Sequence, residues 1–171
     1  MRQKSATFYI FHGDDTLSID EAVGKLGGQR GDDSNADLNI SEFDGQSASV
    51  PEIINAVSSY PFLADKRMAI VRGLITHITR KGAGKIGKDA LKRLTESLPT
   101  LPDYARLILI ENKPLPDSNA ALKVAQSDDH GYVKKFTTPK DITRWIKQRT
   151  KEAYDVEIEP RAMVALSAVT G

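Results

Sequence analysis

The segment whose residue types best fit phosphate binding is Gly82-Ala-Gly-Lys-Ile-Gly-Lys88, which matches the pattern G-x-x-x-x-G-K. In nucleotide-binding loops of this kind, backbone amides hold the phosphates and a following Ser or Thr hydroxyl binds magnesium. Here the following residue is Asp89, and the segment does not come directly after a predicted strand. We therefore interpret Thr79–Lys88 as a flexible basic loop. A P-loop-like NTPase that uses Gly82–Lys88 is the alternative.

The loop after the first predicted strand, His12-Gly-Asp-Asp-Thr16, is the other place where a ligand would bind. Ligands of doubly wound α/β sheets bind beyond the carboxyl ends of the strands. A nucleoside triphosphate would need glycines, a lysine and a hydroxyl in this loop, but the loop carries the carboxylates of Asp14 and Asp15. Each carboxylate would repel a phosphate about 4 Å away by about 1–4 kcal/mol. We predict that this loop holds no nucleotide.

The sequence contains part of the residue set of a phospho-receiver domain, but one essential residue is missing. Such domains combine paired acids after the first strand with a later lysine, as Asp14, Asp15 and Lys113 do here. They also need a phosphoryl-accepting aspartate at the end of the third strand. This chain has Val71-Arg-Gly73 at that place, so phosphotransfer is excluded.

The remaining chemistry-bearing residues do not form a catalytic or metal-binding set. The three histidines are scattered and have no partner at the spacing of metal ligands; they are His12, His77 and His130. The absence of cysteine from the sequence excludes disulfides, thiolate zinc sites and a cysteine nucleophile. We therefore expect no catalytic residue, no metal and no cofactor, and a protein that is not an enzyme.

One segment is a candidate contact site for another protein, Ser58-Ser-Tyr-Pro-Phe-Leu-Ala-Asp-Lys-Arg67. Pro61 ends the preceding predicted helix and favours an extended turn. Adjacent side chains of an extended backbone point to opposite sides, so Phe62 and Leu63 cannot both enter the same core. An exposed aromatic and aliphatic pair is typical of protein–protein hot spots. The residues alone leave two alternatives open: an exposed contact site, or packing under the next strand.

Short apolar runs alternate with helical patterns along the chain. The predicted strands are Thr7–Phe11, Leu38–Phe43, Met68–Val71, Arg106–Glu111 and Tyr132–Phe136. The predicted helices cover residues 17–26, 50–57, 89–98, 117–125, 141–153 and 159–169. Ser18 with Glu21 predicts a capping box for the first helix, and Ser49 predicts a cap for the second. The strongest strands are apolar throughout, which indicates an α/β fold with a doubly wound parallel sheet and helices on both faces.

The chain has 171 residues, 40% of them hydrophobic, and no apolar run approaches the about 20 residues of a membrane span. We expect an α/β domain over residues 1–138. The amphipathic helix over 159–169 has nothing left to pack against, so we expect 139–171 to be the start of a truncated helical domain. Without cysteines or a secretory signal, the expected location is cytoplasmic.

The net charge of +1 conceals an uneven distribution along the chain. Residues 11–65 contain eleven acidic and only two basic residues, whereas Lys66–Lys88 contains seven basic residues and no acid. Lys134–Lys151 contains seven more basic residues and one acid. Such asymmetry indicates that different faces meet different partners. Because the last basic segment includes Trp145, a stand-alone nucleic-acid-binding module is a further alternative.

Several segments, taken in order, form a fairly specific set. They are Phe11–Ala22, Phe43-Asp-Gly45, Tyr60–Arg67 leading into Met68–Val71, Leu107–Ile110, the helix with Trp145 and Ile146, and Ile158–Gly171. This ordered set resembles the delta subunit family of the bacterial DNA polymerase III clamp loader, over essentially the whole chain. The resemblance implies an AAA+-type first domain that has lost its nucleotide site, followed by a helical lid domain.

The resemblance also implies that the first domain binds the ring-shaped sliding clamp (beta) and opens it for loading onto primed DNA during replication. In the family, the clamp-contacting element is a hydrophobic tip after the helix that precedes the third strand. The matching residues here are Tyr60, Pro61, Phe62 and Leu63, with Phe-Leu where family members commonly carry Leu-Phe.

Further partners follow from the same resemblance. They are the gamma or tau and delta prime subunits, through a C-terminal part beyond residue 171, and primed DNA through the complex. No membrane partner is implied. The implied role is that of a non-catalytic accessory subunit of a DNA polymerase holoenzyme.

Overall fold

The computed structural model describes residues 6–28, 36–140 and 142–170, and the chain divides into two compact units, Met1–Phe136 and Thr137–Gly171. The elements of the first unit are β1 (Phe8–Gly13), α1 (Thr16–Gly28), the 3₁₀ helix η1 (Ala36–Asn39), β2 (Ile40–Asp44), α2 (Val50–Ser58), β3 (Arg67–Arg72), α3 (Leu74–Thr79), α4 (Gly84–Ser97), η2 (Leu98–Thr100), β4 (Ala105–Glu111), α5 (Ala120–Ser127) and β5 (Gly131–Phe136). The second unit contains α6 (Ile142–Tyr154) and α7 (Pro160–Thr170).

The first unit is built on a parallel sheet of five strands in the order β2-β3-β4-β1-β5. β1 lies between β4 and β5, so Ile10 pairs with Leu109 on one side and with Val133 on the other. Every residue of β1 and of β4 is buried, because strands inside a parallel sheet are covered on both faces. The predicted doubly wound α/β fold is confirmed.

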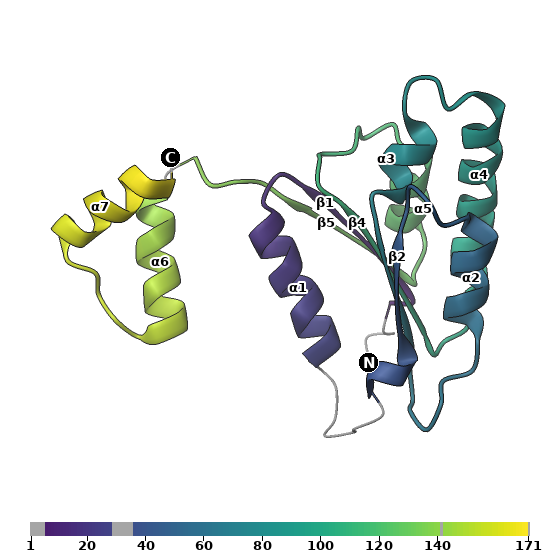
Figure 1. The fold of residues 1–171 in the computed structure, drawn as a ribbon, viewed down its shortest axis with the longest axis horizontal. Coiled ribbons are helices and arrows are strands. Elements are labelled where there is room, and N and C mark those ends of the chain that lie inside the picture. Colours follow the sequence, from purple (N-terminus) through teal and green to yellow (C-terminus); the bar gives the residue numbers. More distant parts are fainter. Residues whose placement is uncertain (1–5, 29–35, 141, 171) are drawn as a thin grey trace. The chain divides into compact units, whose positions relative to one another are not determined.

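Alternate side chains of the central strands enter two separate cores, one on each face of the sheet. In β1, Phe8 and Ile10 belong to the core with α2, α3, α4 and α5, whereas Tyr9 and Phe11 belong to the core with α1. The crossover from β1 to β2 runs along the sheet in the direction opposite to the later crossovers. Since parallel crossovers are right-handed, this reversal puts α1 on one face and the later helices on the other (Figure 1).

The segment between β3 and β4 is more helical than the sequence predicts. The sequence indicates a loop over Thr79–Lys88 and a helix from Asp89, but α4 already begins at Gly84. The prediction of a loop up to Lys88 is wrong because glycine is needed only at the turn before α4. There Gly82 and Gly84 have φ angles of +92° and +59°. The lysines that follow belong to the exposed surface of α4.

The short helix α3, which the sequence does not predict, is capped from a distant strand. Its N-cap residue is Gly73, which has no side chain to offer. The buried carboxylate of Glu111, at the end of β4, accepts hydrogen bonds from the N–H groups of Ile75 (2.7 Å) and Thr76 (3.1 Å). Burial raises the pKa of the Glu111 carboxyl, while these bonds favour its charged form and lower it in part.

The caps of the two other early helices are local. Asp15 caps α1, because its carboxylate accepts hydrogen bonds from the N–H (3.0 Å) and the hydroxyl (2.6 Å) of Ser18. The predicted capping box of Ser18 and Glu21 is therefore wrong: the helix begins at Thr16, and Ser18 donates to the cap. For α2 the predicted cap is confirmed, with Ser49 and Glu52 forming a capping box.

The second unit consists of α6 and α7, which contact each other. Ile146 of α6 and Met163 of α7 are its buried apolar residues among those described. On α6, the Arg149 guanidinium lies 5.6 Å from the ring centroid of Trp145, a cation–π arrangement. None of the helices in the described ranges has the length and apolar character needed to cross a membrane.

The end of β1 yields a stability prediction. A Cβ added at Gly13, which has a φ of +142°, would lie 1.7 Å from the Phe136 carbonyl oxygen. We expect Gly13→Ala to separate β1 from β5 and to lower the free energy of unfolding by about 1–3 kcal/mol or more, measured by urea denaturation. The control is Gly24→Ala on the exposed side of helix α1, where an added Cβ would have nothing within 4 Å; it should stabilise by about 0.5–1 kcal/mol. Equal effects of the two substitutions would contradict the close packing of β1 on β5.

Candidate protein-binding site

The segment that joins α2 to β3, residues 59–66, is called the tip from here on. Because it precedes β3, it lies at the edge formed by the amino ends of the strands, opposite the carboxyl edge where α/β ligands bind. The side chains of Tyr60, Phe62 and Leu63 are 86%, 59% and 69% exposed, and Pro61 is partly buried. These exposures exclude packing under β3, so the tip presents its apolar side chains to the surroundings.

The backbone of Phe62 is held by the side chain of a residue far away in the sequence. The Asn39 carboxamide oxygen accepts a hydrogen bond from the Phe62 N–H at 2.6 Å, and the Asn39 amide donates to the Phe62 carbonyl at 2.8 Å. Asn39 is only 3% exposed. Both bonds are partly buried, and breaking one would leave a polar group of the buried Asn39 side chain unpaired. Asn39 fixes the place and the direction of Phe62.

Arg67 anchors the other end of the tip. Its Nε donates to the carbonyl of Ala56 in α2 at 3.1 Å. Its two terminal nitrogens donate to the Leu38 carbonyl at 2.8 Å and to the Ser41 hydroxyl at 2.9 Å. A planar guanidinium holds several acceptors in a fixed geometry. The first residue of β3 is thereby tied to α2, to η1 and to β2.

The first residues of the tip are braced by the turn before β4. The rings of Tyr60 and Tyr104 are stacked, with centroids 5.2 Å apart and planes 29° apart. The Tyr104 hydroxyl donates to the carbonyl of Ser58 at 2.7 Å. Tyr60 is thus highly exposed, but its ring rests against that of Tyr104.

A second segment adds an exposed apolar side chain beside the tip. Leu38, in η1, is 61% exposed, and its backbone lies beside the tip through the bond to Arg67. We call Leu38, Tyr60, Phe62 and Leu63 the tip surface. Leu63 has a φ of +50°, which is rare for a large side chain. Such a conformation persists only where neighbouring contacts fix the backbone, as Asn39 does next to it.

Sequence reasoning finds the residues of the tip but misses Leu38 and Asn39. Both lie inside the strand predicted over Leu38–Phe43, whereas β2 begins only at Ile40. The bond from Asn39 to Phe62 joins residues 23 positions apart, and no local pattern in the sequence marks that pairing.

The loop after β1, at the opposite edge, is closed by β5. The N–H groups of Asp14 and Asp15 donate to the Phe136 carbonyl oxygen at 3.1 and 3.5 Å. A phosphate bound at this loop would need those same amides, and it would meet the two carboxylates. The geometry supports the prediction that this loop holds no nucleotide.

The Gly82–Lys88 segment does not have the context of a phosphate-binding loop. It follows helix α3 instead of a strand, and its residues from Gly84 onward are the first turns of α4. A Cβ at Gly87 would lie 2.2 Å from the Ile78 carbonyl oxygen. Gly87 therefore allows α3 and α4 to approach closely. This packing role explains the glycine without a phosphate.

His12 is buried and structural. Its Nδ1 accepts a hydrogen bond from the Leu115 N–H at 3.0 Å, which joins the end of β1 to the loop after β4. Burial, the largest cause, and the charge of Lys135 lower the pKa of the His12 imidazole, against the opposing effect of Asp117. Within the described ranges, no three His, Asp or Glu side chains gather as metal ligands would.

The fold defines the first unit as a doubly wound α/β domain, with a parallel sheet in the order β2-β3-β4-β1-β5. Residues 9–135 match the family model of the DNA polymerase III delta subunit, and the chain belongs to this family. No curated protein matches the sequence closely enough to count as a relative.

A solved structure has the same fold. It is the Bacillus subtilis DNA clamp loader delta protein, with a TM-score of 0.71 and 20% sequence identity. The match covers 93% of this chain and 47% of that protein, so the chain spans about half of its length. At this identity the likeness shows the fold.

The pKa of His12 predicts a pH dependence of stability. A lowered folded-state pKa favours the neutral imidazole, so its stabilising contribution is present above about 6.5, the ordinary histidine pKa, and is lost as the pH falls through the folded pKa. Between the ordinary pKa and the folded-state pKa of His12, we expect this group to lower the free energy of unfolding by up to about 1.4 kcal/mol for each unit by which the pH falls. Urea unfolding at a series of pH values measures it.

A variant without the imidazole separates His12 from other titrating groups. His12→Asn keeps a hydrogen-bond acceptor but does not titrate, so its stability should depend less on pH. If His12→Asn keeps the wild-type dependence on pH, another group is responsible.

Proposed function

We propose that this chain is the clamp-contacting part of a clamp-loader delta subunit, which binds the sliding clamp and opens it for loading onto primed DNA. The proposal rests on membership in the delta subunit family. The single observation that carries the site is the exposed pair of Phe62 and Leu63, presented on a backbone that Asn39 holds in place.

Under this proposal, the tip surface inserts into an apolar pocket of the clamp. Each buried side chain of the size of Phe62 or Leu63 contributes about 1.5–3 kcal/mol before entropic costs. Because the backbone of the tip is already fixed, little ordering entropy is lost on binding. Tyr60 and Pro61 give the wedge its shape, and Leu38 enlarges its apolar contact area.

The proposed role needs no nucleotide at this chain. The amides of Asp14 and Asp15 that would meet a phosphate are bonded to Phe136. The work of opening then comes from binding energy at the tip and from ATP hydrolysis in the gamma or tau subunits. We propose that residues 139–171 begin the helical lid domain and that contacts with these subunits and with delta prime lie largely in a C-terminal part. The protein is then a non-catalytic subunit.

The tip surface yields the first binding prediction. We expect Phe62→Ala with Leu63→Ala to weaken binding to the sliding clamp by about 100-fold or more, because two apolar anchors are lost. Isothermal titration calorimetry with the purified clamp measures the affinity, and circular dichroism verifies the fold. The control is Leu17→Ala on α1, an exposed leucine outside the tip, which should bind as the wild type does.

Two outcomes have different meanings. If the wild-type chain does not bind the clamp, the proposed function is wrong. If it binds and the double variant binds equally well, the function stands and the assignment of the site is wrong.

The two hydrogen bonds between the Asn39 side chain and the Phe62 backbone lead to a second binding prediction. Asn39→Ala removes both bonds to the tip backbone without changing an exposed side chain. We expect about tenfold weaker clamp binding, because the tip must then be ordered on binding. The control is Asn119→Ala, which removes a buried asparagine that caps α5 through Ala121 and Leu122. It should lower stability comparably but leave the clamp affinity unchanged. Equal losses of affinity in both variants would mean that stability alone matters.

A further inference from the structure

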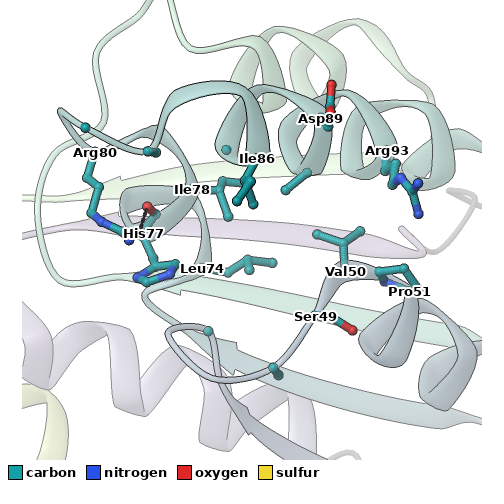
Figure 2. A pocket seen from close by; sticks show the side chains of 16 residues that line it. Ser49, Val50, Pro51, Leu74, His77, Ile78, Arg80, Ile86, Asp89 and Arg93 are labelled. Carbon is teal, nitrogen blue, oxygen red and sulfur yellow. Dashed lines mark hydrogen bonds between the residues drawn. The ribbon is translucent and has the colours of Figure 1, made fainter.

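A groove of about 610 Å³ opens between the start of α2 and the helix pair α3 and α4, away from the tip (Figure 2). The buried side chains of Val50, Leu74 and Ile78 contribute to its lining, and Ile86 lies on it with 85% of its side chain exposed. A volume of this size is within the range of sites that bind ligands or peptide side chains. Ile86 extends the apolar surface of the groove towards the solvent.

The close approach of the helices fixes the walls of the groove. Gly87 of α4 lies against the Ile78 carbonyl of α3, because an added Cβ would be only 2.2 Å from that oxygen. A Cβ added at Gly45, before α2, would likewise lie only 2.3 Å from the Leu74 N atom. These contacts leave little room for the walls to move inward. The groove is therefore preformed.

Cationic side chains lie at both ends of the apolar lining. Arg80 is at one end and donates to the His77 carbonyl, and Arg93 is at the other end and extends towards Pro51 (Figure 2). Among the described residues, no carboxylate forms an ion pair with Arg93. Asp89, the acid in the lining, points away from Val50 in Figure 2. An apolar lining between two cations is complementary to a ligand with apolar side chains and acidic ends.

We propose that this groove binds an acidic amphipathic peptide segment of a partner protein. Aliphatic side chains of the peptide enter between Val50 and Ile86, and its carboxylates pair with Arg80 and Arg93. A nucleic acid fits less well, since no Phe, Tyr or Trp is present among the described lining residues to stack on a base. A phosphate backbone would use the two arginines but leave the apolar lining uncovered.

The groove is separate from the tip surface. It lies at the first residues of α2, around Val50 and Pro51, whereas the tip follows the last residue of the same helix, Ser58. At about 1.5 Å per residue, α2 keeps the two apart by its whole length. One partner can therefore occupy the groove while another contacts the tip.

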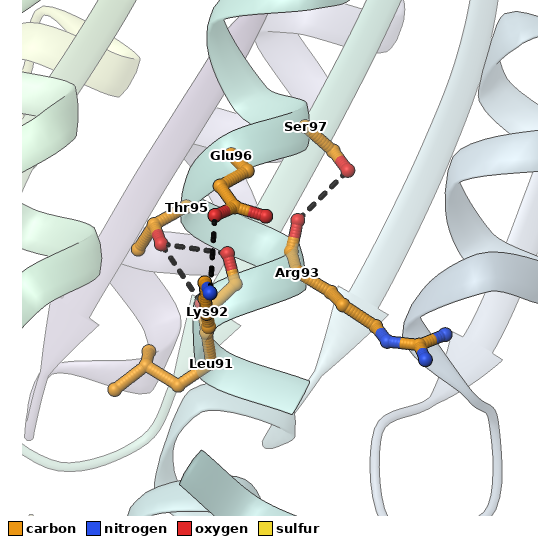
Figure 3. Close-up of polar contacts among 6 residues, drawn as sticks. All are labelled: Leu91, Lys92, Arg93, Thr95, Glu96 and Ser97. Carbon is orange, nitrogen blue, oxygen red and sulfur yellow. Dashed lines mark hydrogen bonds and ion pairs between the residues drawn. The ribbon is translucent and has the colours of Figure 1, made fainter. Parts of the chain in front are cut away.

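Neighbouring residues on α4 provide a matched pair of variants. Arg93 extends from the helix in one direction, whereas Lys92 lies beside Glu96 on another side, 3.9 Å from its carboxylate (Figure 3). Lys92 is not part of the groove lining. Arg93→Glu and Lys92→Glu change the net charge equally, but only the first places a carboxylate in the groove.

The probe is a fluorescein-labelled peptide of about twelve residues, with Leu and Asp recurring at helical spacing. Fluorescence anisotropy with the whole chain, at about 0.15 M salt to screen remote charges, measures the affinity. We expect saturable binding that Arg93→Glu weakens by about tenfold or more and Lys92→Glu by less than about twofold. A peptide with Ala in place of Leu should not bind. Arg93→Glu should leave sliding-clamp binding unchanged.

Four results would overturn the proposal. They are no saturable binding of the peptide, equal weakening by Lys92→Glu, equal binding of the leucine-free peptide, and displacement of the peptide by a single-stranded oligonucleotide that binds more tightly. The second and third would indicate unspecific attraction between charges, and the fourth would make this face a nucleic-acid surface.

Discussion

The position of β1 inside the sheet, between β4 and β5, is the constraint on which the rest of the first unit depends. β1 is buried on both faces and pairs with β4 and with β5. Its alternating side chains need a helical layer on each side, and the reversal of direction after β1 provides both layers. Because the strands are parallel, the loops from strand to helix meet at one edge and those from helix to strand at the other. The two edges can therefore carry different chemistry.

The two edges differ in which groups remain available to contact a ligand or a partner. At the carboxyl edge, the amides of Asp14 and Asp15 donate to Phe136, and those of Ile75 and Thr76 donate to the carboxylate of Glu111. Amides that elsewhere hold phosphates are here bonded within the protein. At the amino edge, the polar groups around the tip are bonded internally too, but apolar side chains remain outside. This edge can therefore bind a partner by burying apolar surface.

Local information was enough for much of the fold and for part of the site. Apolar runs indicate the strands, Ser49 precedes a helix as its cap, and the adjacency of Phe62 and Leu63 argues against burial of both. The unpredicted features depend on contacts between distant segments. Helix α3 is capped by Glu111, 36 residues beyond Ile75, and the tip is held by Asn39 from before β2. The two residues of each pair are farther apart in the sequence than one helix or strand is long, so no local pattern reveals the contact.

Under the proposed function, the anchoring of the tip determines how binding energy is used. A flexible tip would lose about 0.5–1.5 kcal/mol per side chain in ordering before any force reached the partner. Here a force on Phe62 passes through Asn39 to the start of β2, and through Arg67 to η1, β2 and α2. Because β2 pairs with β3 along its length, the force is spread over the backbone bonds of the sheet. Under the proposed function, a force applied at the tip is therefore carried by the sheet and not by the backbone of the tip alone.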